Sequence, residues 1–293
     1  MTKDASIPKR PRLELCWGTL GLATVEDLVD AAAAAGFDAV TVPSSLCAAL
    51  VQDEPRLRAL RHRMRERAIL ITIIDPLVRG LPGIRGRDAM PDEYRDLLDA
   101  TANDCGRFAT ALGATVVNVA HVTGVPTPLD QICDTLDVFA SMLGEHGVKA
   151  AVEFIPGTGI PDLQTACAII QAVGAPNLGI TFDTWHFSRA GGHPSELAHL
   201  EPGSVFALQI NDAHDPVVGG PHIPGAERLL PGEGEIPIVD LLRALLRDQP
   251  DLYVGVEVFS EALRHLGPRR AAVAAFNAAE KVVESLTPVE SPS

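Results

Sequence analysis

Short apolar segments recur along the chain and alternate with segments of helical pattern. Apolar runs of this kind fit strands that are buried on both faces, as in a parallel sheet. Alternation with helices implies right-handed crossovers between parallel strands. Eight such units predict a closed (β/α)8 barrel of the TIM type, which is an α/β fold. The expected strands are Glu14–Gly18, Asp38–Val42, Ala68–Ile74, Thr115–Val119, Val148–Phe154, Leu178–Phe182, Val205–Asn211 and Leu252–Phe259.

The segments between the strands carry helix start and stop signals. Thr24 precedes an Ala-rich segment that Gly36 would end. One long helix is expected over Pro91–Leu112, stopped by Gly113. An open doubly wound sheet is the competing layout, but no GxGxxG motif follows the first strand. We therefore expect a single barrel domain over 13–286, with an N-terminal extension over 1–12 and a C-terminal tail over 287–293.

The composition narrows the classes of partner. The chain has 293 residues, 46% of them hydrophobic, and a formal net charge of −14. An acidic protein repels a phosphate backbone unless basic side chains gather locally, and the densest basic run, Arg56–Arg67, has the spacing of a solvated helix face. Nucleic acid is therefore not an expected partner.

Cysteine usage and hydropathy point to a compartment. Five cysteines are scattered along the chain without a CxxC pair, which is typical of buried thiols in a reducing environment. The first residues lack the apolar core of a signal peptide, and no apolar run reaches the roughly 20 residues of a membrane helix. We expect a cytoplasmic protein that does not enter a membrane.

Polar side chains interrupt four successive apolar strands near their carboxyl ends. They are Glu153, Asp183, Gln209 and Glu257. In a (β/α)8 barrel these strand ends meet at one face. Three carboxylates placed together repel one another unless a cation neutralises them, and an all-oxygen set favours Mg²⁺ or Mn²⁺. Without a cation, the same residues would form an ordinary barrel end with one or two raised carboxylate pKa values.

These segments carry a resemblance to the xylose-isomerase-like TIM barrels, the sugar-phosphate isomerase and epimerase superfamily. The matching pieces are Val152-Glu-Phe154, Phe182-Asp-Thr-Trp-His-Phe-Ser-Arg189, Gln209-Ile-Asn-Asp212, Arg228-Leu-Leu-Pro-Gly-Glu-Gly-Glu-Ile236 and Gly255-Val-Glu257. The resemblance implies one divalent metal ion, held by Glu153, Asp183, Gln209 and Glu257. The family usually has histidine where this chain has Gln209, and a glutamine oxygen suits Mg²⁺ or Mn²⁺ better than zinc.

The DNA-repair branch of the same superfamily, endonuclease IV, matches less well. That branch needs an Asp-x-His pair before its Gly-Glu-Gly motif, and this chain has Ala226 and Arg228 at those positions. Gln209 removes a further zinc ligand. Cleavage of a phosphodiester is therefore not expected.

The resemblance also implies roles for catalytic residues. A divalent ion that chelates a hydroxy-ketone acidifies the adjacent C–H and stabilises the resulting enediolate. In the sugar epimerases the two glutamate ligands move the proton, which makes Glu153 and Glu257 the candidate bases. His186 matches a residue that contacts a substrate oxygen, and Arg228 matches an arginine that faces the substrate.

Further residues are expected around the substrate. Trp17 and Trp185 would form walls of the pocket, with core packing as the equal alternative for both. Arg189 would contact the substrate or form a structural salt bridge. His121, at the exit of the fourth strand, would contact the substrate.

The expected function is a metal-dependent isomerase or epimerase that acts on a sugar or polyhydroxy ketone through an enediolate. The cofactor would be one Mn²⁺ or Mg²⁺ ion, with Co²⁺ as an alternative. A dehydratase or lyase would use the same enediolate to expel a β-hydroxyl or glycosidic group, as inosose and 3-dehydroshikimate dehydratases do. In the latter, glutamine takes the third ligand position, as Gln209 does here.

A metal-free sugar-binding barrel is the second alternative, since Gln209 departs from the family's histidine. The ligand would be a sugar, a cyclitol or a keto acid in each case. Relatives in the superfamily form homodimers or homotetramers, which makes either assembly an expectation for this chain. A flavin or pyridoxal enzyme is disfavoured because no phosphate-binding glycine motif follows the seventh strand.

Overall fold

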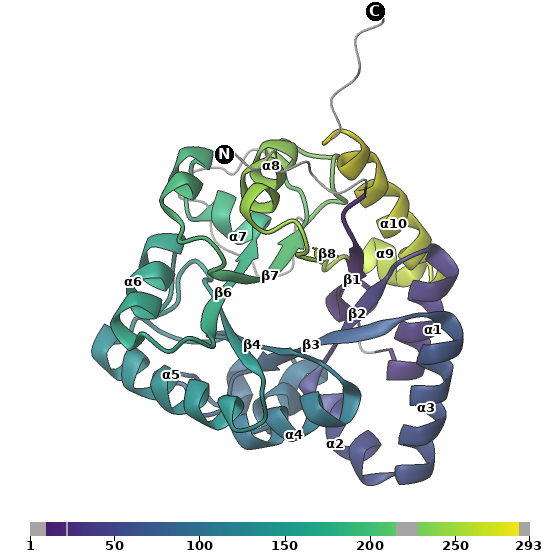
Figure 1. The fold of residues 1–293 in the computed structure, drawn as a ribbon, viewed down its shortest axis with the longest axis horizontal. Coiled ribbons are helices and arrows are strands. Elements are labelled where there is room, and N and C mark those ends of the chain that lie inside the picture. Colours follow the sequence, from purple (N-terminus) through teal and green to yellow (C-terminus); the bar gives the residue numbers. More distant parts are fainter. Residues whose placement is uncertain (1–9, 22, 215–227, 287–293) are drawn as a thin grey trace, which may run out of the picture.

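The computed structural model describes residues 10–21, 23–214 and 228–286. Its parallel strands form a closed barrel in chain order, and the helices surround this central ring (Figure 1). The strands are β1 Leu13–Leu15, β2 Ala39–Val42, β3 Leu70–Leu77, β4 Val116–Ala120, β5 Lys149–Glu153, β6 Leu178–Asp183, β7 Val205–Ile210 and β8 Val254–Val256. The predicted (β/α)8 barrel is confirmed, and each expected strand overlaps an observed one.

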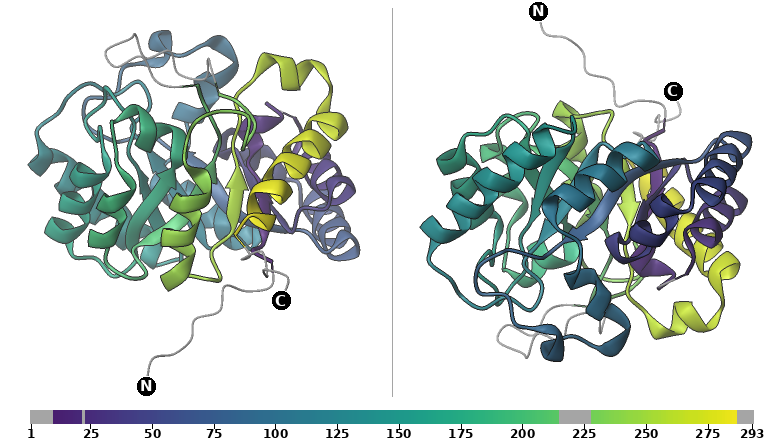
Figure 2. Two further views of the ribbon diagram at one scale, coloured as in Figure 1. Left: turned by 90° about the horizontal axis from the view of Figure 1, so that it is seen from above. Right: turned by 90° about the horizontal axis from the view of Figure 1, so that it is seen from below.

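The helices also lie on the outside of the barrel when the molecule is seen from above and from below (Figure 2). The α-helices are α1 Val25–Ala35, α2 Ser44–Gln52, α3 Glu54–Arg67, α4 Ala102–Leu112, α5 Leu129–Gly144, α6 Leu163–Val173, α7 Thr184–Arg189, α8 Ile238–Asp248, α9 Glu261–His265 and α10 Pro268–Glu284. Short 3-10 helices are η1 Trp17–Thr19, η2 Arg87–Ala89, η3 Asp92–Leu98 and η4 Pro194–His199. Within the described residues, no helix combines the length and the apolarity needed to cross a bilayer.

The long helix expected over Pro91–Leu112 is wrong in its first half. Only α4 is an α-helix there, and η3 precedes it. Thr101 starts α4 with a capping box, in which its side chain accepts from the Asp104 N–H while the Asp104 carboxylate accepts from the Thr101 N–H. This cap turns the chain at Thr101, so the two segments cannot form one helix.

Burial between the barrel and its helices holds the fold together. The barrel strands are almost wholly buried, and the inward faces of the surrounding helices pack on them. Each buried Leu, Ile or Val side chain contributes about 1.5–3 kcal/mol through its transfer from water. This packing fixes the strands, and the functional side chains lie where the strands end.

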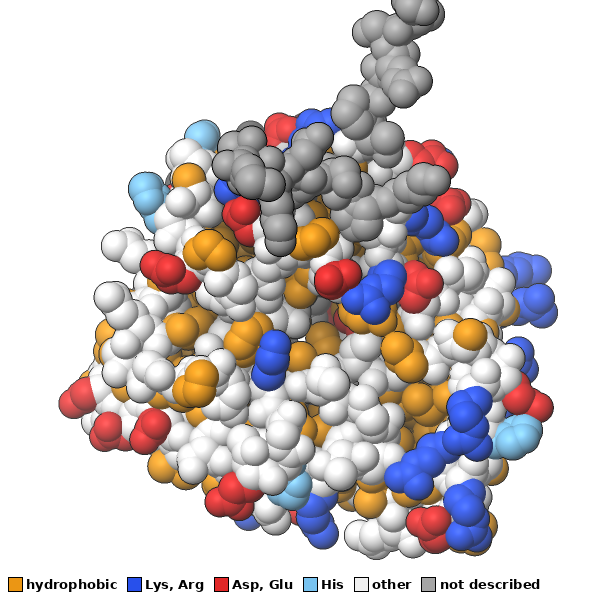
Figure 3. All heavy atoms as spheres, in the orientation of Figure 1, with side chains coloured by type: hydrophobic (Ala, Val, Ile, Leu, Met, Phe, Trp, Pro, Cys, Tyr) orange, Lys and Arg blue, Asp and Glu red, His pale blue; other side chains and the backbone are white. Residues whose placement is uncertain are grey.

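The arginine-rich helix α3 is paired with acidic side chains. Arg56 contacts Glu26 at 2.7 Å, and Arg63 and Arg67 both contact Asp30, at 3.1 and 2.8 Å. On this side of the molecule, at the lower right of Figure 3, basic and acidic side chains lie next to one another. The face is therefore a solvated, charge-compensated helix surface.

Of the expected flanking segments, residues 10–12 are described and residues 1–9 and 287–293 lie outside the described residues. Arg12 leads into β1 and donates to the Tyr253 hydroxyl at 2.8 Å and to the Asp251 carbonyl at 2.6 Å. The start of the barrel is thereby tied to the segment before β8, which closes the ring.

Candidate active site

The four strand-end residues meet at one end of the barrel. Glu153 and Asp183 are the last residues of β5 and β6, Gln209 lies in β7, and Glu257 follows β8 directly. The register places Asp183 beside Gln209, and Gln209 beside Gly255. All four side chains are buried. The barrel thus collects three carboxylates and one amide from four successive strands.

Contacts among these residues show how close they are. Gln209 Nε2 donates to Glu257 Oε1 at 3.1 Å. Donor atoms of Glu153, Asp183 and His186 all lie within 4.8 Å of one another, which is the spacing of a shared cation. His186 lies on α7, which begins directly after Asp183, so a single strand-to-helix turn supplies two of these groups.

Arg228 lies among the carboxylates. Its Nη1 donates to Asp183 Oδ2 at 3.2 Å, to Glu257 Oε2 at 2.9 Å and to the Glu257 carbonyl at 3.2 Å. The guanidinium also lies over the rings of Trp185 and Phe259, 5.1 and 5.3 Å from their centroids. Burial opposes its charge, but the charges of Asp183, Glu257 and Glu153 outweigh burial, and the pKa of Arg228 is raised.

Glu153 is oriented from both sides. Its Oε2 accepts from Asn118 Nδ2 at 2.8 Å, and its Oε1 lies 3.2 Å from His186 Nε2. Asn118 is itself fixed, since its Oδ1 accepts from the Thr181 hydroxyl at 2.7 Å and its Nδ2 also donates to Asp75 Oδ1 at 2.7 Å. The carboxylate plane of Glu153 is therefore set by a chain of buried hydrogen bonds.

Asn211 contacts both Asp183 and Glu257. Its Nδ2 donates to Asp183 Oδ2 at 2.9 Å and to the Glu257 carbonyl at 3.1 Å. The Thr184 hydroxyl donates to the Asn211 side chain at 2.9 Å, which fixes the amide orientation. These contacts hold the ends of β6 and β8 at a constant separation.

Burial changes the proton affinity of two carboxyl groups here. Burial raises the pKa of Glu257 well above its ordinary value, against the opposing effect of Arg228. Burial and the charge of Glu153 raise the pKa of Asp75 to about 7, although Asn118 and Trp17 donate to it. Groups shifted in this way are common at functional sites.

The predicted substrate residues lie in different settings. Trp17 Nε1 donates to Asp75 Oδ2 at 3.0 Å, and its ring meets Phe259 edge-on. Trp185 is almost fully buried beneath the guanidinium groups of Arg228 and Arg189, each 5.1 Å from its ring. Both tryptophans therefore pack within the core and also touch site residues.

His121 is engaged by backbone groups. Its Nδ1 accepts from the Gly159 N–H at 2.9 Å, and its Nε2 lies 2.7 Å from the Pro82 carbonyl. A side chain at Gly124 or Gly159 would overlap the His121 ring, so both glycines allow the chain to pass close to it. Burial lowers the pKa of His121. These contacts join the loops after β3, β4 and β5.

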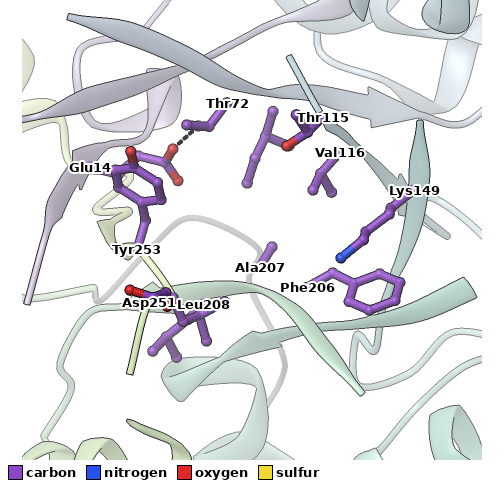
Figure 4. A pocket seen from close by; sticks show the side chains of 12 residues that line it. Glu14, Thr72, Thr115, Val116, Lys149, Phe206, Ala207, Leu208, Asp251 and Tyr253 are labelled. Carbon is purple, nitrogen blue, oxygen red and sulfur yellow. Dashed lines mark hydrogen bonds between the residues drawn. The ribbon is translucent and has the colours of Figure 1, made fainter. Parts of the chain in front are cut away.

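A cavity of about 200 Å³ lies at the other end of the barrel (Figure 4). Its lining comes from residues before the strands or in their first residues, such as Thr72, Thr115 and Tyr253, with Leu208 from the middle of β7, and includes none of the predicted site residues. Glu14 borders it and accepts a hydrogen bond from Thr72. Chemistry in such barrels takes place at the carboxyl ends of the strands, so this cavity is separate from the candidate site.

Comparison with known proteins places the chain in a family. The model of the xylose isomerase-like TIM barrel family matches residues 29–284. The chain belongs to this family. Within the xylose isomerase-like barrels, it is 28% identical to an inosose isomerase from Halalkalibacterium halodurans over 182 residues, 58% of this chain and 64% of the relative. It is 23% identical to a 3-dehydroshikimate dehydratase from Pseudomonas putida over 249 residues, 82% of this chain and 37% of the relative.

These alignments cover the relatives only in part, from 37 to 64% of their lengths. Among solved structures, the IolI protein with a bound zinc atom superimposes with a TM-score of 0.80 at 19% identity, over 95% of this chain and 100% of that one. At that identity the likeness shows the shared fold.

The donor set of this xylose isomerase-like barrel fits a hard divalent cation. Gln209 Oε1 is buried and has no hydrogen-bond partner among the described residues, which is costly unless something positive approaches it. Asp183 lies beside Gln209 in the register, Glu257 accepts from its Nε2, and Glu153 has a carboxylate oxygen within 4.8 Å of one from Asp183. An oxygen-only set of this kind suits Mg²⁺ or Mn²⁺.

Sequence reasoning did not assign Asp75, Asn118 and Asn211 to the site. All three are buried at or near strand ends and hydrogen-bond to predicted site residues or to one another. The signal was the same as for Glu153: a polar residue within an apolar strand at its carboxyl end. Asn118 and Asn211 are neutral amides with no acid–base chemistry of their own, so the sequence does not reveal that they orient the charged groups.

Proposed function

We propose that this protein is a divalent-metal-dependent isomerase or epimerase that acts on a polyhydroxy ketone. Glu153, Asp183, Gln209 and Glu257 would hold the ion. When bound, the ion would supply the positive charge that stabilises the anion formed when a proton leaves carbon next to a carbonyl. The inosose isomerase relatives support this reaction class.

One observation carries the proposal: two buried glutamates lie on well-separated strands of the same barrel end. Glu153 ends β5 and Glu257 follows β8, so two or more strands separate them in either direction around the ring. A substrate between them would present different faces or carbons to the two carboxyl groups. One glutamate could accept a proton and the other could donate one, which is what isomerisation requires.

Neighbouring residues would orient Glu153 and place His186 beside it. Asn118 holds Glu153 Oε2 and leaves Oε1 toward His186. His186 Nε2 lies between Glu153 Oε1 and Arg228 Nη2, the latter at 3.3 Å, so it can donate to the first or accept from the second. His186 is therefore placed to pass a proton to, or hold, a substrate oxygen near Glu153.

A lyase is the second candidate, supported by the dehydratase relatives and by Gln209. If the substrate carries a leaving group β to its carbonyl, removal of the same proton leads to loss of that group. His186 would then protonate the departing oxygen. The site residues and the cation requirement are unchanged, and only the substrate decides the outcome.

A substrate screen in D₂O separates these candidates. Purified protein would be incubated with Mn²⁺ and with inosose, hydroxypyruvate, ketohexoses or 3-dehydroshikimate, and the products followed by NMR. An isomerase returns an isomer or a deuterated substrate, whereas a lyase produces an enone or a diketone. Both activities should be lost with EDTA and restored by Mn²⁺. Turnover that is unaffected by EDTA, or sugar binding without any turnover, would refute the proposal.

A further inference from the structure

Arg228 contacts the same two carboxylates that are expected to hold the metal ion. Its Nη1 lies 3.2 Å from Asp183 Oδ2 and 2.9 Å from Glu257 Oε2. Its side chain is only 4% exposed, and Asp183 is fully buried. A guanidinium and a divalent ion would therefore both be attracted to these two carboxylates. Because the carboxylates are buried, little water screens that attraction.

The oxygens of Asp183 have other donors as well. Oδ1 accepts from the His186 backbone N–H at 2.8 Å, and Oδ2 accepts from Asn211 Nδ2 and from Arg228. The His186 N–H belongs to the first turn of α7, and Thr184 fixes the Asn211 amide. Of these donors, only Arg228 is at the end of a long, flexible side chain.

Glu257 is in a similar situation. Oε1 accepts from Gln209 Nε2, and Oε2 accepts from Arg228. Gln209 could keep this contact while its own Oε1 faces a cation, because the amide offers a donor and an acceptor at once. Arg228 cannot do so, because it has donors only. The guanidinium is thus the group that must move if an ion is to take Glu257 Oε2 and Asp183 Oδ2.

We propose that Arg228 is a built-in competitor of the metal ion. The guanidinium and a divalent cation occupy the oxygens of Asp183 and Glu257 alternately, and an ion binds only as Arg228 leaves. The negative charges of Asp183 and Glu257 are compensated in either state. Ion binding would free the Arg228 guanidinium, which lies beside the substrate region. This inference rests on the proposed function, since it concerns the same metal site.

Calorimetric titration with Mn²⁺ tests the competition. The EDTA-treated, full-length protein would be compared with Arg228→Gln, which removes the charge and keeps a polar side chain. Coupling between two sites typically changes an affinity between about 5-fold and about 150-fold, and we expect Arg228→Gln to bind Mn²⁺ more tightly by a factor in this range. Arg58→Gln on α3 is the matched control, because it removes one positive charge from an exposed helix face.

The possible results differ in what they overturn. Equal or weaker Mn²⁺ binding by Arg228→Gln, with binding by the wild type, would refute the competition and leave the metal site standing. No Mn²⁺ binding by either protein would refute the metal site itself. If Arg228→Gln does not fold, Arg228→Met takes its place, because it removes the positive charge that contacts both carboxylates and keeps a long side chain. Unchanged Mn²⁺ affinity in Arg228→Met would then overturn the proposal.

Trp185 supplies an independent readout. Because the Arg228 guanidinium lies over its ring, departure of Arg228 should change the emission of Trp185. In a Trp17→Phe background, Trp185 is the single tryptophan of the chain. Titration with Mg²⁺ should change its fluorescence when Arg228 is present and change it much less in Arg228→Gln. The same change in both proteins would contradict displacement.

Discussion

Glu14 provides a prediction whose size follows from the structure. This residue of β1 is 1% exposed and lies inside the barrel, where it accepts a hydrogen bond from Thr72. Burial, and to a lesser degree the charge of Asp75, raises its pKa from 4.5 to about 8. The folded chain therefore keeps a proton on Glu14 over a pH range in which the unfolded chain has lost it.

The sign and the magnitude follow from linkage. Where the folded state binds more protons than the unfolded state, the free energy of unfolding falls as the pH rises. For Glu14 this fall begins near its ordinary pKa of 4.5 and ends near its folded pKa of about 8. One pKa unit corresponds to about 1.4 kcal/mol, so Glu14 alone should remove about 4 kcal/mol of stability between about pH 5 and about pH 9.

Glu14→Gln should abolish this penalty. Glutamine has the shape of the protonated acid and can still accept from Thr72, so the variant should match the wild type closely near pH 5. Near pH 9 it should be more stable by several kcal/mol. Urea unfolding followed by circular dichroism at both pH values measures the difference, and the contribution of Asp75 is common to both proteins and cancels.

An exposed glutamate, Glu145, is the control, because Glu145→Gln should change stability little at either pH. If Glu14→Gln and the wild type lose stability in parallel as the pH rises, the Glu14 carboxylate ionises near its ordinary pKa. Solvation through the adjacent cavity would be the reason, and the reasoning from burial would be refuted.

Four other substitutions test the candidate site. Glu153→Gln and Glu257→Gln should each lower turnover at least 100-fold with circular dichroism unchanged, since general acid–base groups contribute about 10²–10⁴-fold. Turnover within a few-fold of wild type would show that the substituted residue is not the base. Gln209→His should shift the metal preference from Mn²⁺ toward Zn²⁺ in competition titrations, because imidazole suits zinc. An unchanged preference would show that residue 209 is not a ligand. Asn118→Ala should weaken Mn²⁺ binding about 10- to 100-fold by freeing Glu153, whereas wild-type affinity would mean that the Asn118 contact does not position the ligand.

The barrel could be predicted because its signals are local. Each strand is a short apolar run. The polar residue that interrupts the run marks the carboxyl end of the strand, as Asp183 does after Phe182. Parallel topology then brings Glu153, Asp183 and Gln209 together without further information. The segment before α4 was harder, because residues 91–98 have acceptable helix composition and only the cap at Thr101 decides where the helix starts.

Contacts made by loops could not be predicted in the same way. The contacts of Arg228 with Asp183 and Glu257, which are 45 and 29 residues away along the chain, did not follow from the sequence. Nothing in the pattern of the surrounding residues fixes where a loop places a long side chain. Likewise, Asn118 looked like a polar interruption of β4, and only the folded barrel shows that it joins Asp75 to Glu153.

Anomalous diffraction from a crystal grown with Mn²⁺ tests the central claim most directly. The account predicts one strong anomalous peak at the carboxyl end of the barrel, within coordination distance of oxygens from Glu153, Asp183, Gln209 and Glu257. A peak elsewhere, or the absence of a peak at Mn²⁺ concentrations that saturate binding in solution, would contradict it.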